Sequence, residues 1–135
     1  MKKNIKYYVK RVYVPLKLLA KFIRISLFVR PPKDFKRDIP IIINNYNQLD
    51  YLKLLLNSLE KRGYENIIIL DNDSSYPPLL EFYKNTRYRV IPLGHNYGYL
   101  ALWKSGVYKE FQNSYFVYTD PDLVIDKECP DDFLR

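Results

Sequence analysis

The chain of 135 residues is long enough to bury a hydrophobic core without disulfide or metal staples, and its 47% hydrophobic content excludes an intrinsically disordered protein. Its net charge of +7 is uneven, because residues 1–37 hold twelve Lys and Arg residues against one acid, Asp34. That segment therefore carries +11 and leaves −4 for residues 38–135, which argues against a folded domain built to bind nucleic acid.

The N-terminal segment has the pattern of an amphipathic helix over residues 13–29. Lys17, Lys21 and Arg24 recur at helical spacing, and apolar residues fill the remaining faces. Pro31 and the proline after it end the helix. The stretch is too short and too charged to span a membrane, and its cations interrupt the apolar region that a signal peptide needs.

We expect this helix to rest on an anionic membrane surface at the cytoplasmic face of a membrane. Its aliphatic and aromatic side chains would enter the acyl boundary, while each Lys or Arg near the headgroups contributes about 1 kcal/mol. The alternative is a helix packed against the rest of a larger protein, with solvated cations. A nucleic-acid arm is the weakest interpretation, because long aliphatic side chains have no role against phosphate.

Beyond this segment, short apolar runs alternate with helical patterns. We predict strands at 39–43, 66–70, 88–92 and 115–119, separated by helices that begin near residues 49, 78 and 99. Alternating strands and helices favour right-handed crossovers, so the fold class is α/β with a mostly parallel open sheet and flanking helices. The predicted domains are a basic segment with its linker at 1–37 and an α/β domain at 38–135.

Four polar loops follow the four predicted strands. In open α/β sheets, ligands bind outside the carboxyl ends of the strands, so these loops would meet at one rim. The sequence contains neither GxGxxG nor GxxxxGK[ST], which excludes the usual dinucleotide and P-loop fingerprints. The loops are Asn44-Asn45-Tyr46-Asn47, Asp71-Asn72-Asp73-Ser74, Gly94-His95-Asn96-Tyr97-Gly98 and Asp120-Pro121-Asp122.

In this order the loops resemble those of GT-A glycosyltransferases of the family-2 type. The resemblance covers about residues 39–126 and rests on IIINNYNQ, IIILDNDSS, GHNYGY with the following WKSG, and YTDPD. It implies a Rossmann-like half domain that binds a nucleotide-diphosphate sugar. It also implies transfer of the sugar to a glycan, lipid or polysaccharide acceptor, with a UDP-sugar as the first expectation.

Asp120 and Asp122 match the family's Asp-x-Asp motif. The resemblance implies that Asp122 ligates a divalent metal and that Asp120 lies near the metal or the ribose. Oxygen ligands of this kind suit magnesium or manganese, which would act as a Lewis acid on the leaving diphosphate. The alternative is that Asp-Pro-Asp is only a turn that closes a strand.

Further donor-binding residues are implied by the first two loops. Tyr46 stands where the family places residues against the nucleobase, with a packing role as the alternative. Asp71 matches a carboxylate that accepts a hydrogen bond from the base, usually uracil, with an Asx-turn or helix cap as the alternative. Asn45 lies in the same base-binding loop.

The third loop and the helix after it supply the remaining matches. Asn96 and Gly98 correspond to the family's Asn-x-Gly, in which Gly lets the backbone turn and approach the ligand. Lys104 stands where many relatives carry Arg, and a Lys cannot grip phosphate bidentately. His95, the only histidine, is expected to be a surface loop residue.

No residue can be assigned as the catalytic base. An inverting transferase needs a carboxylate within reach of the acceptor hydroxyl, and Asp131 and Asp132 fit a solvated tail better. We therefore expect an incomplete GT-A domain that lacks its acceptor half. Two other classes stay open: a nucleotide-sugar-binding module without turnover, and a membrane-tethered interaction domain without a ligand.

The basic segment gives the first testable prediction. The chain should sediment with anionic liposomes at low salt and be released as salt is raised, because screening weakens attraction between exposed charges. Neutral liposomes are the control. Equal binding to neutral vesicles, or no binding to anionic ones, would contradict electrostatic attachment.

Overall fold

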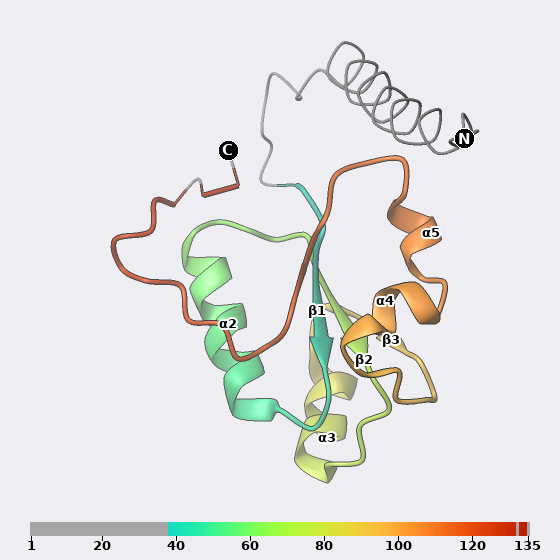
Figure 1. The fold of residues 1–135 in the computed structure, drawn as a ribbon. Helices are drawn as coiled ribbons and strands as arrows, with labels where there is room; N and C mark the ends of the chain where they lie inside the picture. Colours follow the sequence, from blue (N-terminus) through green and yellow to red (C-terminus); the bar gives the residue numbers. More distant parts are fainter. Residues whose placement is uncertain (1–37, 132, 135) are drawn as a thin grey trace, which may run out of the picture. The chain divides into compact units, whose positions relative to one another are not determined.

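A computed structural model describes residues 38–131, 133 and 134, and the predicted amphipathic helix lies outside this part of the chain (Figure 1). Four strands form one parallel sheet in the order β3-β2-β1-β4. This confirms the predicted α/β fold with a parallel sheet. The strands are β1 (Ile41–Asn45), β2 (Ile67–Asp71), β3 (Arg89–Pro92) and β4 (Val117–Thr119).

Helices cover both faces of the sheet. Helix α2 (Leu49–Lys61) joins β1 to β2, and α3 (Pro77–Asn85) joins β2 to β3. Between β3 and β4 the chain forms a 3-10 turn η1 (Gly98–Leu100) and two short helices, α4 (Ala101–Lys104) and α5 (Tyr108–Phe111) (Figure 1). None of the described helices is both long and apolar enough to cross a membrane.

The single helix expected from about residue 99 to residue 111 is interrupted. Gly106 adopts a left-handed conformation with φ of 80°, and its N–H donates to the carbonyl oxygen of Trp103 at 3.1 Å. A left-handed glycine closes a helix by satisfying one of its last carbonyl groups. The chain therefore turns between α4 and α5 although the apolar pattern continues.

Strand β1 lies between β2 and β4 and is buried on both faces. Its side chains alternate, so Ile41 and Ile43 join the apolar layer under α2 and α3, whereas Ile42 joins the layer under α4 and α5. Burying an isoleucine side chain contributes roughly 1.5–3 kcal/mol. The isoleucine runs of β1 and β2 thus bind two helical layers to one sheet.

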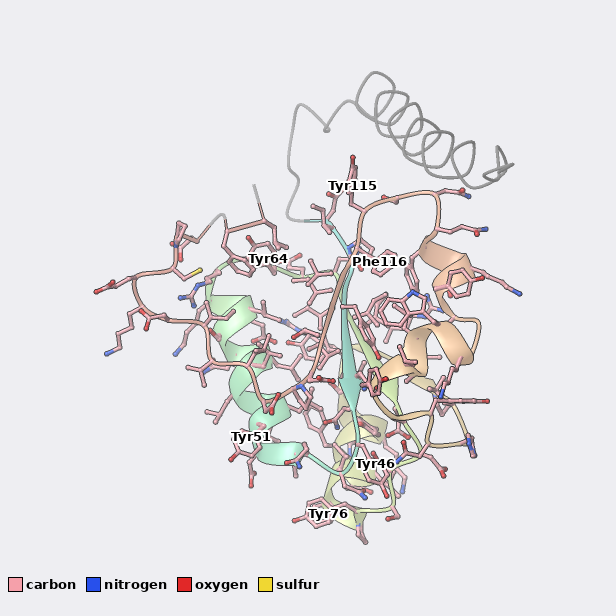
Figure 2. The ribbon with its side chains drawn as sticks, in the orientation of Figure 1. Tyr46, Tyr51, Tyr64, Tyr76, Tyr115 and Phe116 are labelled. Atoms are coloured by element: carbon pink, nitrogen blue, oxygen red, sulfur yellow. The ribbon has the colours of Figure 1, made fainter. Side chains whose placement is uncertain are left out.

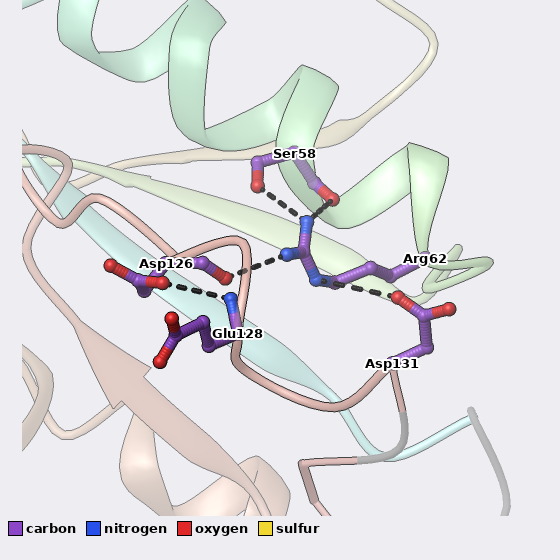
Figure 3. Close-up of polar contacts among 5 residues, drawn as sticks. All are labelled: Ser58, Arg62, Asp126, Glu128 and Asp131. Atoms are coloured by element: carbon purple, nitrogen blue, oxygen red, sulfur yellow. Dashed lines mark hydrogen bonds and ion pairs between the residues drawn. The ribbon is translucent and has the colours of Figure 1, made fainter.

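The segment after β4 returns along α2 and is tied to it by Arg62, whose side chain is 13% exposed (Figure 3). The guanidinium donates to the Ser58 carbonyl oxygen at 3.3 Å and the Ser58 hydroxyl at 3.0 Å. It also donates to the carbonyl oxygen of Asp126 at 3.1 Å and lies 3.7 Å from the Asp131 carboxylate. The residues beyond the Asp-Pro-Asp motif are therefore part of the folded domain.

The Arg62 contacts give the second testable prediction. Arg62→Met should lower the free energy of unfolding by about 1–3 kcal/mol, because it removes a shielded donor from several oxygens at once. Arg87→Met is the matched control, since the Arg87 side chain is 69% exposed, forms an ion pair with Glu60 at 2.8 Å and otherwise lies over the Tyr88 ring, 5.4 Å from its centroid. An exposed pair of this kind contributes roughly 0–1 kcal/mol. Equal shifts of the urea unfolding midpoint in the two variants would contradict the prediction.

Candidate functional site

The described part of the sheet has a topological switch point between β1 and β4. From β1 the chain continues to β2 and β3 on one side, and β4 then pairs with the other edge of β1. Ligands in open α/β sheets bind in the crevice at such a point. A cleft of about 560 Å³ opens there, lined by Asn44, Tyr46, Gln48, Tyr51, Asn72, Asn96, Gly98, Tyr99, Asp120, Pro121 and Asp122.

Two buried asparagine side chains join the loops around this cleft. The Asn44 amide donates to the Asp120 carboxylate at 3.3 Å and to the Gly98 carbonyl oxygen at 3.4 Å. The Asn72 amide donates to the same Gly98 oxygen at 3.1 Å, and its Oδ1 accepts the Tyr97 N–H at 2.8 Å. The ends of β1, β2 and β4 are thereby connected to the loop before η1.

The predicted Asn-x-Gly loop lies in the cleft. Gly98 has φ of 66°, a left-handed conformation that costs a residue with a side chain roughly 1–2 kcal/mol. Its N–H donates to the Asn96 Oδ1 at 2.9 Å, so the loop also closes on itself. Asn96 and Gly98 both lie in the cleft lining at the carboxyl end of the sheet.

The two carboxylates of the Asp-Pro-Asp motif face the same cleft. Both Asp120 and Asp122 are exposed, and Pro121 between them is buried. No group of three or more His, Cys, Asp or Glu side chains in the described residues could hold a metal ion. Two carboxylates nevertheless fit magnesium or manganese, since these cations keep several waters and share substrate phosphates. Asp120 and Asp122 are the residues that would hold the cation.

Residues 41–135 match the family model described as Glycosyl transferase family 2. The chain belongs to this family. No significant match is found among curated proteins or among solved structures. The sheet described above is thus the Rossmann-like half of a GT-A fold, and the family supports glycosyl transfer as the general activity.

Exposed tyrosine rings line the cleft of this family-2 domain. Tyr46 follows β1 and is 46% exposed, and Tyr51, on the first turn of α2, is 52% exposed. Figure 2 places both at the same end of the sheet, opposite the end that carries Tyr64. Tyr99 of η1 is 76% exposed and completes the aromatic lining. Tyr46 is therefore available to a ligand and not packed in the core.

Asn45 and Asp71 lie on the other face of the sheet, outside the cleft lining. Asn45 is fully buried, and its amide donates to the Tyr83 hydroxyl of α3 at 2.8 Å. Asp71 is 6% exposed, and its carboxylate accepts the Ser74 N–H at 3.3 Å, as in an Asx-turn. Burial raises the pKa of Tyr83, while the hydrogen bond from Asn45 acts in the opposite direction.

The physical reason for this placement is strand alternation. Asn45 and Asp71 are register partners on the α3 side, and the residues one step away, Asn44 and Asn72, line the cleft. The resemblance selects Asn45 and Asp71, whose side chains face α3, and not their neighbours Asn44 and Asn72, which face the described cleft. Side chains two residues apart in a strand point to the same face, so Asn44 faces the same side of the sheet as Ile42, which lies under α4.

Lys104 and His95 lie outside the cleft lining, whereas three residues without a predicted role lie in it. Lys104 ends α4 and is exposed, but it is not part of the cleft lining. His95 is exposed as expected, and its ring lies 4.7 Å from that of Tyr97. Gln48, Tyr51 and Tyr99 line the cleft although the sequence interpretation gave them no role. Gln48 and Tyr99 are the last residues of the quoted segments IIINNYNQ and GHNYGY, whereas Tyr51 lies outside all quoted segments.

The Asn72 contacts give the third testable prediction. Asn72→Ala should increase amide hydrogen exchange at Tyr97 about tenfold, because the Tyr97 N–H loses its acceptor. The Gly98 N–H is the internal control, since its acceptor is Asn96. Unchanged exchange at Tyr97 would mean that Asn72 does not hold this loop.

Proposed function

We propose that this family-2 domain binds a nucleotide-diphosphate sugar in the switch-point cleft and transfers the sugar to a glycan, lipid or polysaccharide acceptor. A divalent cation held by Asp120 and Asp122 would sit on the diphosphate. The observation that carries the proposal is that both carboxylates line the same cleft as Tyr46 and the Asn96–Gly98 loop.

The charges of the cleft support a metal-assisted mechanism. Its described lining includes two carboxylates and no Lys, Arg or His side chain. With an effective dielectric constant of about 20, two unit charges about 4 Å apart repel by about 4 kcal/mol, so a diphosphate beside these carboxylates needs a counter-charge. Bound magnesium or manganese supplies that charge and a Lewis acid for the departing diphosphate.

The protein's own groups would orient the donor. The Tyr46 ring can stack on the base, a contact typically worth about 1–3 kcal/mol. Gly98 lines the cleft without a side chain, and the position that a Cβ would take there is open space with no atom within 4 Å, so a ligand can approach this backbone closely. Uridine is the first base to test because of the family resemblance. The resemblance assigns recognition of uracil to Asp71, which lies outside the cleft lining. Guanosine is therefore the second base to compare.

A membrane location is the remaining part of the proposal. The +11 charge of residues 1–37 and the −4 charge of residues 38–135 favour a domain tethered by its N-terminal segment to an anionic cytoplasmic surface. Such a location would bring the cleft near a lipid-linked acceptor.

The metal ligands give the fourth testable prediction. UDP should bind in the presence of manganese, measured by titration calorimetry, and Asp122→Asn should weaken the manganese-dependent binding at least about tenfold, or about 1.4 kcal/mol. The reason is the loss of one of two anionic ligands. Asp126→Asn is the matched control, because the same charge is lost outside the cleft, where Asp126 accepts the Glu128 N–H at 2.8 Å.

Two results would count against this mechanism. Binding that is indifferent to a chelator would mean that no cation bridges the diphosphate. Equal losses in Asp122→Asn and Asp126→Asn would mean that general charge, and not metal ligation, controls affinity. In either case the Asp-Pro-Asp segment would be only a turn.

A further inference from the structure

We infer that Asn44 is a positioning residue that holds the Asp120 carboxylate in place for the cation. The inference rests on the proposed function, because it needs a metal at Asp120. The resemblance selects Asn45 as a donor-binding residue but gives no role to its neighbour Asn44.

The hydrogen bonds of Asn44 define its orientation. An amide nitrogen has two N–H groups, and here they point to the Asp120 carboxylate at 3.3 Å and the Gly98 carbonyl oxygen at 3.4 Å. Both partners can only accept hydrogen bonds, so the amide cannot be reversed without losing both contacts. Asn44 is also only 7% exposed, which leaves its side chain little freedom.

The sheet register brings Asn44 and Asp120 together. Ile42 is opposite Tyr118 in the parallel pair of β1 and β4, so two residues further along, Asn44 and Asp120 lie on the same face. Asp120 is exposed and follows the last residue of β4. Among the described residues its carboxylate has no other hydrogen bond, so the buried central strand provides its one fixed contact.

Apart from Asp120, the only described partner of the Asn44 amide is the Gly98 carbonyl oxygen, which already accepts a shorter hydrogen bond from Asn72 at 3.1 Å. The fold therefore gives little other reason for an asparagine at this position. The Asn44 Oδ1 is buried and has no hydrogen-bond donor in the described structure. An unsatisfied buried acceptor is unfavourable, and the three preceding residues of β1 are buried isoleucines. An apolar residue would suit the strand better, whereas holding Asp120 requires a donor at this point.

This donor has two effects on the carboxylate. It occupies one Asp120 oxygen and leaves the other free of protein hydrogen bonds. It also restricts the side chain to one orientation before the cation arrives, which lowers the conformational entropy that binding must remove. Partners of this kind beyond the metal ligands typically change metal affinity about 10- to 100-fold.

The test is the Asn44→Val substitution in the full chain. We expect the thermal unfolding midpoint to stay the same or rise, because the unsatisfied acceptor is removed. The apparent manganese affinity in the presence of UDP, measured by titration calorimetry, should fall about tenfold. A structural role would instead lower stability and leave the manganese affinity unchanged, and that result would overturn the inference.

A double-mutant cycle with Asp120→Ala tests whether Asn44 affects manganese binding through Asp120. Asn44→Val should weaken manganese-dependent binding in the wild-type background and have little effect once Asp120 is absent. Equal effects in both backgrounds would show that Asn44 acts elsewhere and would also overturn the inference. Chelator-insensitive UDP binding by the unaltered chain would instead remove the proposed function itself, and the assignment of Asn44 with it.

Discussion

Strand β1 is paired at both edges and buried on both faces, so each of its side chains must point to one of the two faces of the sheet. Ile41, Ile43 and Asn45 belong to the layer of α2 and α3, while Ile42 and Asn44 belong to the side of α4 and the cleft. The same alternation continues through the neighbouring strands in register. The strand that organises the hydrophobic core therefore also determines which polar groups face the cleft.

The cleft is organised around one backbone atom, the Gly98 carbonyl oxygen. Amides from Asn44 and Asn72 converge on it, and Asn44 extends the network to Asp120. The left-handed turn at Gly98 presents this oxygen to both strands at once. Low-dielectric surroundings strengthen such contacts but make any unpaired member costly, as at the Asn44 Oδ1. The inferred role of Asn44 would offset this loss of stability by fixing the position of the Asp120 carboxylate.

Much of this architecture could be predicted from the sequence. The isoleucine runs located β1 and β2, and the polar loops predicted to meet at one rim do share a cleft, with Tyr46, Asn96, Gly98 and the Asp-Pro-Asp motif all in its lining. The choice between Asn44 and Asn45 was harder for a physical reason. A strand buried on both faces is a continuous apolar run, so its pattern does not reveal which residues face which layer. The interruption at Gly106 was also missed, because apolar periodicity continues across a glycine whose left-handed φ only the structure reveals.

We propose that the switch-point cleft holds a nucleotide diphosphate through a cation on Asp120 and Asp122. A crystal structure with UDP and manganese, with the metal located by its anomalous scattering, tests it most directly. We expect one manganese peak in contact with these carboxylates and the diphosphate, with the base against Tyr46. A diphosphate bound without a cation, or a manganese peak away from both carboxylates, would contradict it.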